Sequence, residues 1–95
     1  MNNEEQIIQS PEFDDVVCTL SDDACHLILH NDDVHTFDYV IVSLMEICHH
    51  EVYQAEQCAH IVHHNGKCDV KTGTYDVLHL MKDQLTSKGL SVTID

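Results

Sequence analysis

The sequence predicts an α+β domain in which helices cover one face of a small antiparallel sheet. Short apolar runs of the kind that forms strands stand near both ends of the chain. Between them, apolar residues recur every three or four positions in three segments, which is the period of an amphipathic helix. The resulting order is β-α-α-β-α-β, with room for an extra N-terminal strand. It suits three helices packed on one face of a three-stranded sheet.

The first part of the chain divides into a tail and two short strands. Residues 1–14 are polar and acidic and include the only proline, so we expect a flexible tail before a single core domain at 15–95. The runs VVCTL (16–20) and CHLIL (25–29) are typical of strands. The spacer SDDA is typical of a turn, so the two runs form a hairpin or two successive strands.

Two helices should follow. Thr36 suits the N-cap of the first. Its apolar face has helical spacing and comprises Phe37, Val40, Ile41, Leu44, Ile47 and Cys48. The polar sequence CHHE interrupts this pattern, and a second apolar face comprises Val52, Ala55, Ala59 and Val62. Gly66 is a natural residue to end the second helix.

The last third of the chain contains a strand, a helix and a final strand. CDV (68–70) is a candidate strand and KTGTY (71–75) a candidate turn. A third helix is predicted by Val77, Leu80, Met81 and Leu85, and it ends at SKG with Gly89 after its C-cap. LSVTI (90–94) alternates as a half-buried strand does.

Composition excludes several classes of partner. A net charge of −13 with only four Lys and Arg argues against nucleic acid and anionic membranes and favours a basic or cationic partner. No stretch approaches the roughly 20 apolar residues of a membrane-spanning helix, and the first residues lack signal-peptide features. We therefore expect a cytoplasmic protein. The five cysteines include no C-x-x-C pair, which favours reduced core thiols over a disulfide framework.

The nine histidines raise the question of a metal site. His60 lies three and four residues before His63 and His64, a spacing that can chelate a metal from one helix face. No second motif is spaced to supply further ligands, and H-E-x-x-H is absent. The sequence also lacks a G-x-S-x-G elbow, a Cys-centred signature and a phosphate-binding glycine loop. We predict no metal, no cofactor and no enzymatic activity, with a His-rich metal-binding domain as an alternative.

Three acceptors follow the apolar run LIL: Asn31, Asp32 and Asp33. A turn needs about one such residue for its backbone geometry. The three residues form either a solvated turn whose charge favours the next helix N-terminus, or a site that holds a cation.

The segment ILHNDDVHTFDYVIVSLMEI, followed after one more helix by IVHHNGK, resembles the ClpS family. Members are small adaptors that recognise N-terminal degradation signals (N-degrons) and deliver them to Clp AAA+ unfoldases. The resemblance covers roughly residues 25–95, and the interval from Asn31 to His63 matches that of the family.

The resemblance implies a site for the free α-ammonium of an N-terminal Leu, Phe, Tyr or Trp. By analogy, the Asn31 oxygen and the His63 imidazole accept hydrogen bonds from this amine, Asp33 helps directly or through water, and Asp32 contributes to the field. The apolar pocket is lined by Phe37, Val40, Ala59 and Leu90, with His35 at its edge. Because His63 must be neutral to accept, binding should weaken as the pH falls below neutrality.

The resemblance also implies docking on the N-domain of a ClpA- or ClpC-type unfoldase through the last helix. Asp76 matches the acidic docking position of the family, but Met81 stands where the family has lysine. The pocket departs from the family too: His35 replaces a Thr, and Phe37 and Ala59 replace two Met. A further alternative is an acidic interaction domain for internal basic peptides, which would tolerate acetylation of the ligand and weaken steeply with salt.

Overall fold

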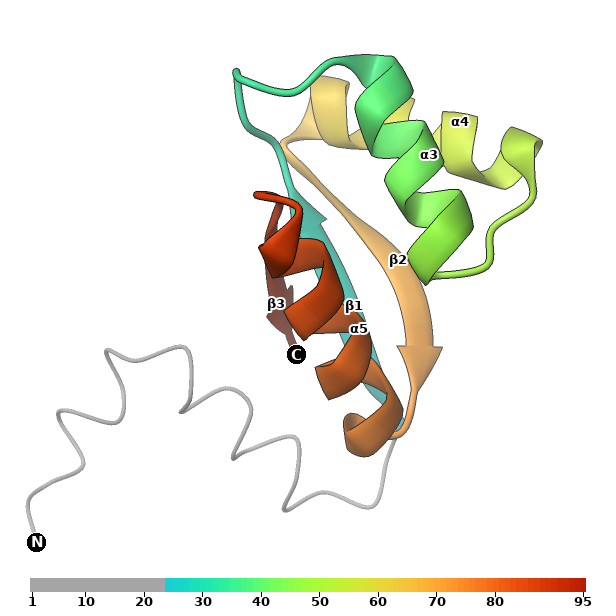
Figure 1. The fold of residues 1–95 in the computed structure, drawn as a ribbon, viewed down its shortest axis with the longest axis vertical. Coiled ribbons are helices and arrows are strands. Elements are labelled where there is room, and N and C mark those ends of the chain that lie inside the picture. The colour runs from blue at the N-terminus through green and yellow to red at the C-terminus, as the bar shows by residue number, and fades with distance from the viewer. Residues whose placement is uncertain (1–23) are drawn as a thin grey trace, which may run out of the picture.

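The computed structural model describes residues 24–95 and has the element order β-α-α-β-α-β that the sequence predicts (Figure 1). The tail expected at 1–14 and the strand expected at 16–20 lie outside the described residues. The elements are β1 (Cys25–His30), α3 (Phe37–Ile47), α4 (Val52–Asn65), β2 (Lys67–Gly73), α5 (Tyr75–Ser87) and β3 (Ser91–Ile94).

The three strands form one antiparallel sheet in the order β2-β1-β3. Along the central strand, Cys25, Leu27 and Leu29 are buried, and the residues between them are more exposed, as expected when one face of a sheet is covered. The buried face forms a single core with the three helices. Helix α5 packs on all three strands, α4 on β2, and α3 on α4 and α5.

The sequence-based expectation of a turn at 71–75 is wrong in its first half. Strand β2 continues to Gly73, which pairs with Cys25 of β1. The register shifts by one residue between Leu27 and Ile28, so that Val70 is the extra residue of a bulge. The pairing with a strand more than 40 positions earlier stabilises the extended conformation of Lys71 and Thr72, and local turn propensity does not predict it.

The helix ends follow the predicted capping residues. Thr36 Oγ1 accepts a hydrogen bond from the Tyr39 backbone N–H at 3.2 Å and so caps α3. Gly66 ends α4 with φ 93°, and Gly89 follows α5 with φ 85°. Both φ values lie in the left-handed region that favours glycine. These ends matter for function because they position the loops around the pocket described below.

The cysteines differ in their state. Cys48, Cys58 and Cys68 are free, buried thiols, as expected. Burial raises the pKa of Cys48 to about 11 and that of Cys58 to about 12, so both are protonated at neutral pH. Cys25 is disulfide-bonded, which corrects the expectation of reduced thiols at that position.

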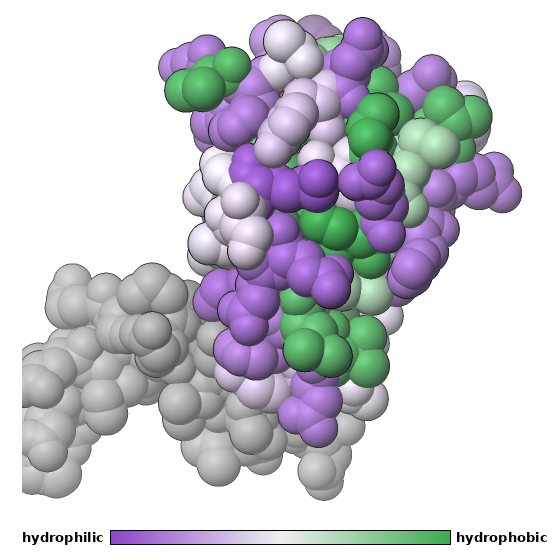
Figure 2. Space-filling view, viewed as in Figure 1, coloured by the Kyte–Doolittle hydropathy of each residue, from purple (hydrophilic) through white to green (hydrophobic). Residues whose placement is uncertain are grey.

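The face of residues 24–95 shown in Figure 2 is mainly hydrophilic. Figure 2 shows hydrophobic side chains reaching one face between hydrophilic ones, over α3 and α5. The exposed apolar residues of these two helices include Val42, Met45, Val77 and Leu80. Among residues 24–95, no helix has the length and hydropathy needed to span a membrane.

Candidate functional site

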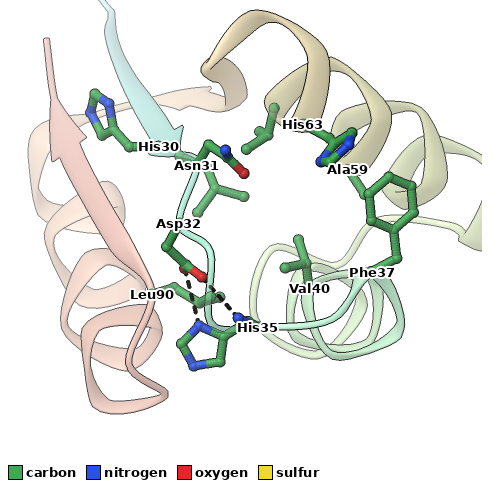
Figure 3. Close-up of a pocket in the computed structure, with 11 residues that line it drawn as sticks. His30, Asn31, Asp32, His35, Phe37, Val40, Ala59, His63 and Leu90 are labelled. Carbon is green, nitrogen blue, oxygen red and sulfur yellow. Dashed lines mark hydrogen bonds and ion pairs between the residues drawn. The ribbon is translucent and has the colours of Figure 1, made fainter.

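A small pocket, open at its mouth, lies where four parts of the chain meet. They are the loop after β1, the start of α3, the C-terminal half of α4 and the residue before β3 (Figure 3). Eight of the residues that the sequence indicated line it: Asn31, Asp32, His35, Phe37, Val40, Ala59, His63 and Leu90. The lining also includes Leu29, His30 and Val62.

The end of α4 brings the two motifs of the sequence together. The Asn31 backbone N–H donates to the Gly66 carbonyl at 2.9 Å, and the Gly66 N–H donates to the Val62 carbonyl at 2.9 Å. The loop after β1 is therefore tied to the last turn of α4, which carries His63. Asn31 and His63, more than 30 positions apart in sequence, consequently share the rim of one pocket (Figure 3).

Asn31 and His63 are both exposed, and both remain free to bind a ligand. Within the described part of the chain, neither side chain takes part in a hydrogen bond. The Asn31 amide offers a carbonyl oxygen, and a neutral imidazole offers one nitrogen lone pair. Two unpaired acceptors at the mouth of an apolar pocket suit a ligand that carries N–H donors next to an apolar group.

Asp32 has a different role, because its carboxylate already accepts hydrogen bonds within its own loop. Oδ1 accepts from the backbone N–H groups of Val34 and His35 at 2.8 and 2.9 Å, and Oδ2 accepts from His35 Nδ1 at 3.0 Å. Burial raises the pKa of the Asp32 carboxyl, but the hydrogen bonds from His35 and Val34 outweigh it and hold that pKa below its usual value. The carboxylate therefore stays ionised at neutral pH.

Asp33 does not line the pocket. Its side chain is exposed, and none of the other residues in 24–95 contacts it through a hydrogen bond or an ion pair. The structure therefore places Asp32, and not Asp33, beside Asn31 and His63. A role for Asp33 in holding an amine would have to act through water or through the electric field.

The apolar wall consists of side chains from α3, α4 and the start of β3. Phe37, 36% exposed, stands edge-on to the rings of His60 and His63, with centroid distances of 4.9 and 5.3 Å. Ala59 is 3% exposed and adds little volume at its side of the pocket. The Phe37 ring thus contacts two imidazoles of α4, and both Phe37 and the small Ala59 line the pocket.

Three lining residues were missed by sequence reasoning. Leu29 is an inward-facing residue of β1, and Val62 is one helical turn after Ala59, so both were assigned only to the core. A signal for Val62 was present, since i and i+3 share a helix face. The His30 side chain points toward β3, where its Nε2 lies 2.8 Å from Thr93 Oγ1 (Figure 3).

Asp76, the residue expected to dock on a partner, lies outside the pocket in the first turn of α5. It is exposed, like the neighbouring Val77 and Leu80. Met81, which stands where the family has lysine, is 9% exposed and belongs to the core. This region is a second surface, separate from the pocket.

The histidines of α4 lie close together without forming a metal cluster. The rings of His60 and His64 are 6.3 Å apart and those of His63 and His64 are 5.2 Å apart, measured between centroids. Among residues 24–95, no three His, Cys, Asp or Glu side chains are grouped so that they could hold a metal ion. The geometry therefore lends no support to the metal-binding alternative.

Comparison with known proteins agrees with this architecture. The sequence profile of a family described as "ATP-dependent Clp protease adaptor protein ClpS" matches residues 20–93. The ClpS adapter proteins of several Campylobacter jejuni strains are 46% identical over 48 residues, which is 48% of this chain and 50% of theirs. The chain thus matches about half the length of these curated relatives.

A solved structure shares the fold. It is Agrobacterium tumefaciens ClpS2 bound to L-phenylalaninamide, with a TM-score of 0.74 and 18% identity over 79% of this chain and 98% of that one. The profile match extends over most of the chain and includes every residue that lines the pocket. An adaptor family also agrees with the expectation of a protein that is not an enzyme. The chain belongs to the ClpS family of Clp protease adaptor proteins.

Proposed function

We propose that this chain is a receptor for N-degrons, which are free N-termini that begin with a large apolar residue such as Leu, Phe, Tyr or Trp. It delivers the bound protein to a Clp AAA+ unfoldase for proteolysis. The single observation that carries the proposal is the pair of unoccupied acceptors, Asn31 and His63, at the rim of an apolar pocket.

The polar rim fits an α-ammonium group. Such a group has three N–H donors and one positive charge, which match the Asn31 oxygen, the neutral His63 imidazole and the ionised Asp32 carboxylate. An acetylated N-terminus has neither the charge nor the three donors. The rim therefore discriminates between a free N-terminus and an internal segment of chain.

The apolar part fits the side chain of the first residue. Burial of a Leu or Phe side chain contributes about 1.5–3 kcal/mol, and each hydrogen bond to a charged group contributes about 1.5–3 kcal/mol. After the cost of association, a dissociation constant near 1 μM, about −8 kcal/mol, is the expected scale. An adaptor needs this moderate affinity because it has to release its cargo.

A bound ligand in a related fold supports the same assignment. L-phenylalaninamide, the ligand of Agrobacterium tumefaciens ClpS2, combines a free α-amine with one large apolar side chain. We propose that the pocket of this chain accepts the same combination. Phe37 lines the pocket and lies edge-on to His63, and we propose that its ring narrows the mouth, so that β-branched first residues are disfavoured.

We further propose that α5 docks on the N-domain of a ClpA- or ClpC-type unfoldase. Asp76 supplies an exposed acidic group, and Val77 and Leu80 supply exposed apolar area on the same helix. Because this surface is separate from the pocket, cargo and unfoldase can be bound together. A flexible tail at 1–14 and a cytoplasmic location remain predictions from the sequence.

Fluorescence anisotropy tests the proposal with one labelled peptide in three forms that start with Leu, N-acetyl-Leu and Gly. We expect saturable micromolar binding of the free Leu form only. Equal binding of all three forms, or binding of none, would contradict an α-amine pocket. Equal binding that weakens steeply with salt would instead indicate the acidic interaction domain, since the chain has a net charge of −13.

A further inference from the structure

The loop between β1 and α3 is anchored by one imidazole, that of His35. Its Nδ1 lies 3.0 Å from Asp32 Oδ2 (Figure 3). An ionised carboxylate can only accept, so Nδ1 carries the hydrogen and donates it. The side chains of Asp32 and His35 are only 24% and 21% exposed, so this pair is partly shielded from water. His35 thereby fixes the direction of the carboxylate at the pocket rim.

The other side of the imidazole is held by α3 and by the turn before β3. The ring stacks on Tyr39, with centroids 4.8 Å apart and planes 16° from parallel. The Tyr39 hydroxyl donates to the Lys88 carbonyl at 2.7 Å. A Cβ atom on Gly89 would lie 3.2 Å from His35 Nε2, so the ring packs directly against the backbone of this turn. The next residue, Leu90, lines the pocket.

We propose that His35 is a positioning residue for the α-amine site and that its protonation opposes ligand binding. The inference rests on the proposed function. When His35 is neutral, the negative charge of Asp32 is available to the ammonium of the ligand. When His35 is an imidazolium, a positive charge 3.0 Å from the carboxylate compensates that charge before the ligand arrives.

Among residues 24–95, the ion pair that His35 makes is with Asp32 of its own loop. The other titratable side chains named around it are Tyr39 of α3, which stacks on the ring, and Lys88 of the turn after α5, whose backbone carbonyl accepts from Tyr39. The Lys88 ammonium points to Glu46 of α3, with Nζ 3.4 Å from Oε1. Asp32 is therefore the charged group through which protonation of His35 acts on the pocket.

Two protonations should then oppose binding as the pH falls. His63 loses its acceptor when it is protonated, and His35 neutralises Asp32. Histidines change charge between about pH 5 and 8, so below about pH 7 both effects act while a peptide's α-amine, with a typical pKa near 8, is mostly charged. By linkage, Kd should fall as the pH rises. The slope of log Kd against pH should approach about −2 when two protons compete with the ligand, and about −1 when only one does.

The test compares His35→Asn with His35→Ala, using the free Leu peptide from pH 5.5 to 7.5. An Asn N–H can replace the Nδ1–H donor to Asp32 but does not titrate in this range. At pH 7.5 we expect His35→Asn, which keeps the donor to Asp32, to bind more tightly than His35→Ala, and His35→Ala to bind about five- to tenfold more weakly than the natural chain. Toward pH 5.5 the slope of log Kd against pH should be less steep by about one in His35→Asn than in the natural chain.

Thermal denaturation of each variant separates positioning from packing. If both variants lose affinity equally at every pH and lose stability equally, His35 only fills space and the inference fails. Unchanged slopes in His35→Asn would overturn it as well. A natural chain that binds no free-amine peptide would overturn the proposed function itself, which is a distinguishable result.

A second measurement does not depend on folded variants. Binding and protonation are reciprocally linked, so a bound peptide should make His35 take up its proton at a lower pH in the natural chain. Nuclear magnetic resonance of the His35 ring with and without the Leu peptide reads this directly. A titration of His35 that the peptide leaves unchanged would contradict the inference.

Discussion

The two rims of the pocket are built in opposite ways. One rim, called the α4 rim, lies next to the end of α4 and comprises His63 of that helix and Asn31 of the loop after β1. Both side chains are exposed, and neither makes a hydrogen bond within the described residues. On the loop side, Asp32 accepts three hydrogen bonds, and His35 and Tyr39 connect it to the turn before β3. The hydrogen-bond acceptors of the first rim are free for a ligand, whereas the acceptors of the second rim are mostly used by hydrogen bonds within the protein.

The difference teaches how a small domain combines binding with rigidity. A charged group that already has its hydrogen-bond partners still attracts a ligand of opposite charge through its field, but its hydrogen bonds mainly hold its neighbours in place. A group without partners can bind a ligand without breaking a hydrogen bond within the protein. Substitutions on the α4 rim should therefore change binding more than stability, and substitutions on the loop rim should change both.

The largest effect is expected on the α4 rim. His63→Ala and Asn31→Ala each remove an acceptor for the α-ammonium, so each should weaken binding of the free Leu peptide by about 10- to 100-fold. The thermal midpoint should change little, because both side chains are exposed. Anisotropy and thermal denaturation of the same samples measure the two quantities.

His64→Ala is the matched control for this prediction. His64 is the next residue on α4, is also exposed and does not line the pocket. Its removal should leave the affinity within about twofold. If His64→Ala weakens binding as much as His63→Ala, the effect belongs to the helix end in general and the comparison of the two rims is wrong.

A smaller effect on binding is expected from Ala59→Met. Ala59 is buried at the pocket wall, so a longer side chain would occupy volume that the first residue of the ligand needs. We expect about tenfold weaker binding of a Phe or Trp peptide and a smaller loss for Leu, since the aromatic side chains are larger. Ile61→Met, at an exposed site of the same helix, is the control. Equal losses for all first residues would argue against a steric origin.

The loop rim is tested by two glycines with nearly equal φ. Gly66 and Gly89 have φ of 93° and 85°, so replacement by Ala should cost about 1 kcal/mol of backbone strain at either site. At Gly66 the new Cβ would meet nothing within 4 Å, but at Gly89 it would meet His35 at 3.2 Å. Gly89→Ala should therefore destabilise by about 1 kcal/mol more in urea unfolding. If both substitutions lower the free energy of unfolding equally, the His35 side chain moves away from the new Cβ atom without loss of stability.

Local signals in the sequence predicted most of the fold. Thr36, Gly66 and Gly89 end their helices as expected because capping depends on the residue itself and its immediate neighbours. The continuation of β2 through Lys71 and Thr72 was missed because it depends on pairing with β1. A distant strand supplies that interaction, and no window of local sequence contains it.

The sequence predicted most residues that line the site but not the contacts that these residues make with one another. Resemblance to the family indicated eight of the residues that line the pocket. It did not indicate that Asp32 is occupied within its loop, or that Tyr39 and Gly89 hold His35. These contacts join residues up to about 50 positions apart and depend on how α3, α5 and β3 pack together.

The smallest effect concerns acid stability and again distinguishes the internally bonded rim. The pKa of Asp32 is held below its usual value in the folded chain, so folding favours the ionised form. Its contribution is then fully present above the ordinary carboxyl pKa of about 4 and is lost as the pH falls through the lower, folded-state pKa. Asp32→Asn should lower the free energy of unfolding by about 1 kcal/mol at pH 6 and much less at pH 3. Urea unfolding between these pH values measures the difference. Asp33→Asn, at an exposed residue that makes no such hydrogen bonds, should leave the pH dependence as it is; an equal change in both variants would point to net charge rather than to the bonds that hold the loop.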